Sequence, residues 1–327
     1  MSSELDIAAH SLPALAPKGL KLGKKAGEPV GRSVAASLSG RTGKLIVYFI
    51  AFLWTIPNLG LLISSFRPEI PVKTTGWWMV FKNPKFTLEN YKSVWGSTGS
   101  QGGDNLSHYF VNSLRITIPS VVISVGLAAL AAYAFSWMKF KGRDWVYVAV
   151  VTMLIVPLQT ALIPLLRMFT SGAHIGTFTI FPDFNLHDSV ITIWAAHTCF
   201  GMPFCVFLLR NFMSGLPKEV MEAGRVDGAG HLTMFRKVVL PLSVPAIASV
   251  TIYQFVYIYN DLLIGKIFGG TKNFPIIAKL VEVSGTRGQS WHLLTAAAFI
   301  SMVLPLVVFF SLQKYFVRGL LAGAVKG

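Results

Sequence analysis

The segment between residues 210 and 238 contains the most regularly patterned polar residues of the chain. Pro217 suits the first turn of a helix, because its missing N–H costs nothing there. Glu219 and Glu222 place carboxylates early in such a helix, where the helix dipole favours negative charge. Gly228 can end the helix in the left-handed conformation that other residues disfavour. The segment is therefore expected to form a short helix, a glycine turn and a second short helix that leads into Pro241.

Small residues fall on one flank of the first of these helices. Val220, Ala223 and Gly224 share that flank, which allows close approach by another chain. Glu222 beside them offers a carboxylate for an ion pair or a charged hydrogen bond. Such a flank suits docking into a groove of a second protein. The alternative is an amphipathic helix that merely lies at a membrane surface.

A second set of polar residues lies within long apolar stretches. Gln159 follows Pro157, and prolines kink a helix and free backbone carbonyls. Tyr253, Gln254 and Tyr257 are expected on one helix face, and aromatic rings with polar tips suit contact with a hydroxylated ligand such as a sugar. The alternatives are simple helix bending at the prolines and routine packing of the aromatic residues.

Asn260 and Asp261 lie at the end of the same apolar stretch as Tyr257. An acidic residue at a membrane margin is a functional hypothesis by default, here a contact with a solute in a pathway. The alternative is that Asp261 caps or pairs at the membrane interface while Asn260 bonds to a neighbouring helix. Both interpretations remain open from the sequence.

Residues that could hold a metal or perform catalysis are scattered. Cys199 and Cys205 are six positions apart and therefore lie on different faces of a helix. The histidines outside the apolar stretches show no ligand spacing; they are His108, His174, His187 and His292. No nucleophile, base and acid are arranged together. We expect no catalytic residue, no metal site and no cofactor bound by this chain.

Long apolar segments must position these residues. Of the 327 residues, 53% are hydrophobic and only 13% are charged, whereas soluble domains carry about 25% charged residues. About 20 consecutive apolar residues cross a bilayer as a helix. Six segments meet this requirement: 45–66, 114–138, 145–166, 189–209, 239–263 and 293–312. The sequence therefore predicts an all-α polytopic membrane protein with six transmembrane helices.

The positive charges indicate orientation. The chain has a net charge of +15, and 18 of its Lys and Arg residues fall on the side of the two termini against 10 on the opposite side. Lys and Arg are enriched in cytoplasmic loops, so both termini are expected in the cytoplasm. This distribution also removes the need for nucleic acid as a partner.

Residues 1–44 form a separate segment that is rich in Ala, Ser, Gly and Lys. It lacks helical or strand periodicity, so we interpret it as a disordered basic cytoplasmic arm. An alternative is that its lysines contact anionic membrane lipid.

The loop at 210–238 resembles the EAA motif of ABC importer permeases. Glu222-Ala223-Gly224 is followed after three residues by Gly228, and after nine more by Val238-Val239-Leu240-Pro241. Asp227 before the glycine also fits the family pattern. Gly224 in place of the second alanine and Val238 in place of isoleucine are mild departures.

Other segments resemble the maltose-type carbohydrate permeases within that family. Phe86–Tyr91, Phe110–Leu114 and the last fifteen residues are similar to characteristic family segments. Tyr259-Asn260-Asp261 stands where the subfamily shows Trp-Asn-Asp. His197–Pro203 and Arg318–Gly323 look most like the α-glucoside permeases. The resemblance covers residues 45–327.

The resemblance implies a type I ABC importer transmembrane domain in a bacterial or archaeal inner membrane. It implies a second homologous permease, a dimer of ATPase subunits that uses ATP and Mg, and an external sugar-binding protein as partners, besides membrane lipid. The solute is expected to be a di- or oligosaccharide such as an α-glucoside. The residues that would couple to the ATPase are Glu219, Glu222, Ala223, Gly224, Asp227, Gly228, Leu240 and Pro241.

Two other functional classes compete with this interpretation. A self-sufficient secondary transporter or channel would predict intramembrane charges and an inverted repeat, and neither is visible. A membrane-embedded enzyme would need clustered His, Asp or Glu residues, which are also not seen.

Overall fold

The computed structural model describes residues 40–96, 105–186, 188–270, 272–283 and 290–324. The predicted arm at 1–44 therefore lies almost wholly outside the described residues. The chain divides into two units, residues 1–57 and 58–327. The described part of the first unit is the beginning of helix α2 (Arg41–Ser65), which crosses the boundary. Everything below concerns the second unit.

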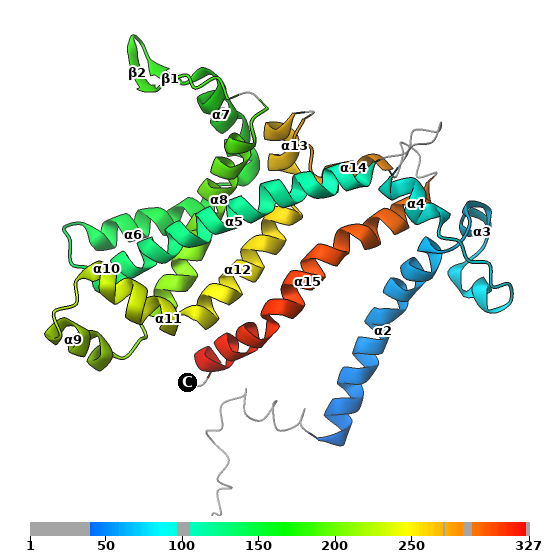
Figure 1. The fold of residues 1–327 in the computed structure, drawn as a ribbon, viewed down its shortest axis with the longest axis horizontal. Helices are drawn as coiled ribbons and strands as arrows, with labels where there is room; N and C mark the ends of the chain where they lie inside the picture. Colours follow the sequence, from blue (N-terminus) through cyan, green and yellow to red (C-terminus); the bar gives the residue numbers. More distant parts are fainter. Residues whose placement is uncertain (1–39, 97–104, 187, 271, 284–289, 325–327) are drawn as a thin grey trace, which may run out of the picture. The chain divides into compact units, whose positions relative to one another are not determined.

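Long apolar helices dominate the second unit (Figure 1). Three of them are long and apolar enough to cross a membrane unaided: α5 (Leu106–Trp137), α8 (Val190–Met213) and α15 (Trp291–Ala324). Helix α2 also qualifies by length and composition. Two further spans are bent helix pairs. The described residues thus contain four helices that are long and apolar enough to span a membrane, or six spans if each bent pair counts as one.

The third predicted span is broken, which corrects the expectation of a single helix over 145–166. Helix α6 (Arg143–Thr152) and a 3₁₀ turn (Met153–Ile155) meet α7 (Leu158–Ser171) at 108°. Val156 and Pro157 between them have extended backbones. A proline has no N–H to continue a helix and pushes the preceding residue out of the helical region, so the chain turns there.

The fifth predicted span, 239–263, is also interrupted. Helix α10 (His231–Met234), a π-helical segment (Phe235–Val239) and α11 (Leu240–Leu242) meet α12 (Val244–Tyr259) at 76°. Pro241 and Pro245 stand on either side of Ser243, at which the bend occurs. Each proline removes one backbone donor, so the regular ladder cannot run through this region.

The core lies where α5 packs against α8 and α12, and α12 in turn packs against α15. Ala128, Ala129 and Ala132 of α5 are buried there. Small residues let membrane helices approach closely, so these alanines account for the tight packing of α5.

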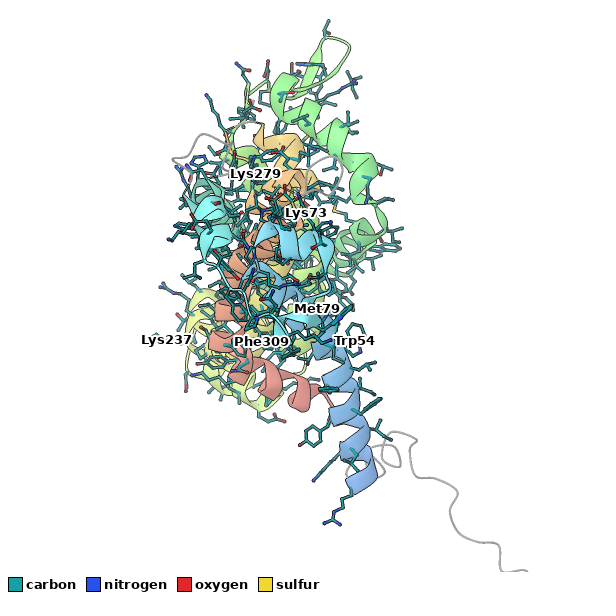
Figure 2. The ribbon with its side chains drawn as sticks, turned by 90° about the vertical axis from the view of Figure 1, so that its right-hand side faces the viewer. Trp54, Lys73, Met79, Lys237, Lys279 and Phe309 are labelled. Carbon is teal, nitrogen blue, oxygen red and sulfur yellow. The ribbon has the colours of Figure 1, made fainter. Side chains whose placement is uncertain are left out.

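Short elements close the ends of the bundle. One end carries α3 (Glu69–Thr74), a 3₁₀ helix (Trp77–Phe81), α4 (Glu89–Trp95) and α14 (Ile276–Val283). The other end carries α9 (Lys218–Val226) with α10 and α11. Figure 2 labels Lys279 of α14 and Lys237 of the π-helical segment toward these two ends. Helix α13 (Leu263–Gly269) and a hairpin of β1 (Ala173–Ile175) and β2 (Phe178–Phe181) complete the described elements.

A buried arginine organises the connection between α2 and α4. Arg67 is 4% exposed, and its guanidinium donates to the carbonyls of Pro71 and Gly76 and to the Thr75 hydroxyl. Asn90 donates to the carbonyls of Ser65 and Arg67. Each buried donor therefore has a partner, which keeps this connection ordered.

Candidate functional site

Helix α9 forms where the pattern of polar residues predicts a short helix. It begins at Lys218, directly after Pro217, whose φ of −57° suits a helix start. Glu219 lies in its first turn and Arg225 in its last. These charges complement the two ends of the helix dipole, so the local sequence supports the helix.

The turn after α9 depends on Gly228. Its φ is +74°, in the left-handed region that favours glycine. The N–H of Gly228 donates to Arg225 O and that of Ala229 to Gly224 O, both at 3.0 Å. This pair of bonds is the Schellman arrangement that ends many helices. A Cβ at Gly228 would meet no atom within 4 Å, so the backbone angle, and not space, requires the glycine.

The inner side of α9 is tied to the bundle. Met221 is only 2% exposed, and Arg225 Nη2 donates to Trp137 O at 3.1 Å. The Trp137 indole donates in turn to Met213 O at the end of α8, at 3.0 Å. Helix α9 is thus connected to the ends of two membrane-spanning helices, through which a displacement of α9 can act on the bundle.

Gly224 packs directly against Met234 of α10. A Cβ on Gly224 would collide with the Met234 thioether, and Met234 is itself buried. The departure from the family's alanine at this position therefore has a local cause: the methionine fills the space that the missing side chain leaves.

The outer side of α9 faces away from the chain's own core. Glu219, Glu222, Ala223, Asp227 and Gly228 are all exposed. Val226 is 87% exposed, which is unusual for an apolar residue in a folded helix. The sequence motif and the exposed surface coincide, so this side is available to a second protein.

The segment from α10 onward differs in detail from the predicted second short helix. Phe235 and Val239 are buried, but Leu232 is 67% exposed. The backbone from Phe235 to Val239 is π-helical, an arrangement that is rare and concentrates at functional positions. Leu240 is half-buried and Pro241 is exposed, so the end of the motif marks the start of the bend before α12.

The predicted pathway residues on α12 do not share one face, which corrects that expectation. Tyr253 is 46% exposed, and its ring stacks on that of Tyr257 with 6.3 Å between centroids. Gln254 is fully buried; its amide lies 3.4 Å from Ser124 Oγ and 3.4 Å from Cys205 Sγ. Adjacent residues on a helix are 100° apart. Gln254 therefore points into the core, whereas Tyr253 is exposed and Tyr257 is half-buried against the core.

The other pathway candidates are Gln159 of α7 and the adjacent residues Asn260 and Asp261, which follow α12. Gln159 is exposed in the first turn of α7. Asp261 Oδ1 accepts the N–H of Ile264 at 2.7 Å, so the capping interpretation holds for its geometry. Asn260 is exposed and donates to Val256 O of its own helix at 2.9 Å, and not to a neighbouring helix as the alternative had expected.

Several residues of this site escaped the sequence argument. Met234 lies within the motif loop and packs against Gly224. Trp137 and Tyr133 contact the loop from α5. A tryptophan at the end of an apolar stretch was visible in the sequence, but its partner in α9 lies 88 positions away. Only the fold brings them together.

No group of three or more His, Cys, Asp or Glu that could hold a metal occurs among the described residues. Cys205 is buried and Cys199 is exposed, in agreement with the prediction that they lie on different faces. His187 lies outside the described residues.

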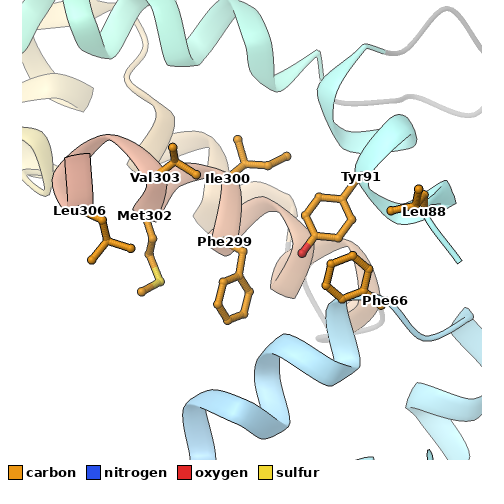
Figure 3. Close-up of a pocket in the computed structure, with 8 residues that line it drawn as sticks. All are labelled: Phe66, Leu88, Tyr91, Phe299, Ile300, Met302, Val303 and Leu306. Atoms are coloured by element: carbon orange, nitrogen blue, oxygen red, sulfur yellow. The ribbon is translucent and has the colours of Figure 1, made fainter. Parts of the chain in front are cut away.

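An apolar groove of about 410 Å³ runs along α15 and α4 (Figure 3). Phe66, Tyr91 and Phe299 contribute rings to it. The Tyr91 hydroxyl is already engaged with Ser65 Oγ at 2.7 Å. Solute sites combine apolar walls with a few polar groups that orient the ligand, so this groove does not suit a sugar.

The family model for "Binding-protein-dependent transport system inner membrane component" matches residues 124–321. The chain belongs to this family of ABC transporter permeases. The matched region includes the whole motif loop and the bundle of α8, α12 and α15.

Two curated relatives have the same percentage identity to this chain, over matches of different length. The Synechocystis osmoprotective compounds uptake permease protein GgtD is 47% identical over 86% of this chain and 91% of its own length. The Rhizobium meliloti alpha-glucoside transport system permease protein AglG is 47% identical over 75% of this chain and 61% of its own length.

A solved structure shows the same fold. A chain of a bacterial ABC transporter involved in the import of alginate superposes with a TM-score of 0.63 at 18% identity, covering 85% of this chain and 98% of that chain. The architecture is thus that of a type I importer transmembrane domain, as the motif resemblance predicted.

Proposed function

We propose that this chain is a permease subunit of an ATP-driven, binding-protein-dependent sugar importer, and that α9 is its coupling helix. The observation that carries the proposal is the two-sided construction of α9. Its inner side is bonded to Trp137 at the end of α5, while Glu222 and Ala223 are exposed on its outer side. A helix that transmits force between two proteins needs one side that is fixed to its own chain and another side that is free to contact the partner.

The proposed partners follow from this role. A separate ATPase subunit would supply ATP hydrolysis with Mg, since the matched family is the inner membrane component of a binding-protein-dependent transport system. A dimer of such ATPases would dock on the α9 end of the bundle, and an external sugar-binding protein on the opposite end. A second permease would complete the pathway. The chain would lie in the inner membrane of a bacterium or archaeon, with both termini in the cytoplasm.

The proposed mechanism is a change of equilibrium between inward- and outward-facing states. Closure of the ATPases would pull α9, and the bonds at Arg225 and Trp137 would pass that displacement to α5 and α8. A decisive population shift requires about 5.5 kcal/mol of differential binding. ATP binding to the partner ATPase can shift the equilibrium by this amount through α9 only if the contact between α9 and the bundle is rigid.

The proposed solute is a di- or oligosaccharide of the α-glucoside type. The support is the similarity to AglG, together with the stacked pair of Tyr253 and Tyr257, whose rings and hydroxyls suit a sugar. Gln159, Asn260 and Asp261 are further candidates for polar contacts in the pathway, and we assign the buried Gln254 to helix packing. The equally similar GgtD favours a second candidate, an osmoprotective solute.

The test is reconstitution of the complete transporter in proteoliposomes. Uptake of labelled α-glucosides should require ATP, the ATPase subunit and the binding protein together. Uptake that proceeds without ATP would favour the alternative of a self-sufficient secondary transporter or channel. Affinity of the binding protein for α-glucosides, other sugars and osmoprotective compounds would then separate the two candidate solutes.

A further inference from the structure

A basic pocket lies between the last turn of α5 and the α9–α10 turn. Helices α9 and α10 belong to the bundle end that carries the coupling helix (Figure 1). It has a volume of about 410 Å³. Three segments contribute its cationic or titratable side chains: Lys139 from the α5–α6 connection, Arg225 from α9 and His231 from α10. Its apolar walls include Trp137 and Met234.

Two of the three basic groups of this pocket, Arg225 and His231, are held in position by hydrogen bonds. Arg225 is fixed by its bond to Trp137 O, and a guanidinium has five N–H donors, so most of them remain for a ligand. His231 Nδ1 lies 3.1 Å from the Tyr133 hydroxyl, so its other ring nitrogen, Nε2, is not used in this bond. Within the part of the chain that the structure describes, no carboxylate pairs with Lys139 or Arg225.

We propose that this pocket binds a phosphate group, supplied by the head group of an anionic phospholipid in the cytoplasmic leaflet. Arginine and lysine side chains are the usual binders of phosphate. Basic pockets between membrane helices on the cytoplasmic side bind anionic head groups. The inference rests on the proposed function, which places α9 in the cytoplasm.

The position of the pocket favours a lipid over an acidic side chain of the ATPase. Trp137 is the last residue of a membrane-spanning helix, and Lys139 follows two positions later. Tryptophan concentrates at the level of lipid head groups. The surface that suits the ATPase is the outer side of α9 with Glu222. The pocket, in contrast, is lined by Arg225 and Trp137, whose bond ties α9 to α5. A bound phosphate would join the α5–α6 connection to α9 and stiffen the coupling contact.

The test uses the assembled transporter in nanodiscs of phosphatidylcholine with or without phosphatidylglycerol. Native mass spectrometry, without nucleotide, counts the phosphatidylglycerol that each complex retains. Lys139→Gln should weaken this retention about tenfold, the effect of one charged contact. Lys141→Gln is the matched control, because Lys141 is exposed in the same connection, has the same charge and does not line the pocket; it should retain lipid like the wild type.

Three results would overturn the proposal. Equal retention by the two variants would remove the pocket as a lipid site. If millimolar inorganic phosphate displaced the phosphatidylglycerol from the complex, free phosphate and not a lipid head group would be the source of the bound phosphate. If Lys139→Gln weakened binding of the ATPase subunit and left lipid retention unchanged, the pocket would be assigned to an acidic side chain of the ATPase. None of these three results depends on whether α9 is the coupling helix. Failure of that proposed function would appear instead as normal solute uptake by the Glu222→Lys transporter.

Discussion

The Met234 thioether occupies the position that a side chain on Gly224 would need. Gly224 belongs to α9 and Met234 to α10, so the two residues hold the halves of the motif loop against each other. The substitution of glycine for the family's alanine and the buried methionine thus form one packing unit.

This contact predicts that Gly224→Leu destabilises the transporter by about 1–3 kcal/mol, the usual cost of overpacking. Gly224→Ala should cost less, because the end of a methionine side chain can move. Met234→Ala should relieve the Gly224→Leu defect, and a double-mutant cycle by thermal unfolding of the purified complex measures the coupling energy. Additive effects of the two changes would contradict direct packing.

Gly228→Ala should reduce coupling between ATP hydrolysis and uptake, and Gly228→Val should reduce it further. The cause is the φ of +74°, which costs a non-glycine residue about 1–2 kcal/mol. Gly230→Ala is a matched control, since Gly230 has a φ of −68° and an added Cβ would meet no atom within 4 Å. The measurement is the number of solutes imported per ATP hydrolysed. A stable Gly228→Val transporter with normal coupling would refute the assignment of α9.

Glu222→Lys should abolish most binding-protein-stimulated ATPase activity, because it reverses the charge at the exposed centre of α9. Glu222→Gln should have a smaller effect, since an amide can still form a neutral hydrogen bond. The control is Asp144→Lys, which reverses an exposed carboxylate in the first turn of α6, outside the motif loop. Loss of a charged contact of about 1.5–3 kcal/mol corresponds to roughly 10- to 100-fold in assembly affinity. Equal loss of activity in the Asp144→Lys control would indicate a general defect.

Gln254→Ala should lower stability and leave solute affinity unchanged. The buried amide joins Ser124 of α5 and Cys205 of α8, and such interhelical bonds contribute about 0.6–1.7 kcal/mol in membranes. Tyr253→Ala should do the opposite, because that ring is exposed and stacked on Tyr257. Thermal unfolding and the KM for uptake separate the two effects. A changed KM in Gln254→Ala at normal stability would return Gln254 to the pathway.

The introduced thiol of Ser214→Cys should react with a maleimide from the cytoplasmic side only. Ser214 is exposed directly after α8, at the bundle end that carries α9. The background would replace Cys199 and Cys205 to remove other thiols. An impermeant maleimide added to intact cells should fail to label this position and should label it after lysis. Labelling in intact cells would reverse the proposed orientation.

The sequence alone was sufficient to predict the apolar helices, the short helix after Pro217 and the left-handed turn at Gly228. Each of these depends on local chemistry: runs of apolar residues, the missing N–H of proline and the freedom of glycine. The motif around Glu222 and Gly228 also identified the family that the comparison then confirmed.

The tertiary structure decided which side of each helix packs against the rest of the bundle. It placed Gln254 in the core between Ser124 and Cys205, paired Gly224 with Met234, and joined Arg225 to Trp137. It also bent the third and fifth spans at their prolines. In a helix that is apolar on all sides, periodicity does not show which face meets a neighbour. That choice depends on how distant segments pack, and packing is a property of the whole bundle.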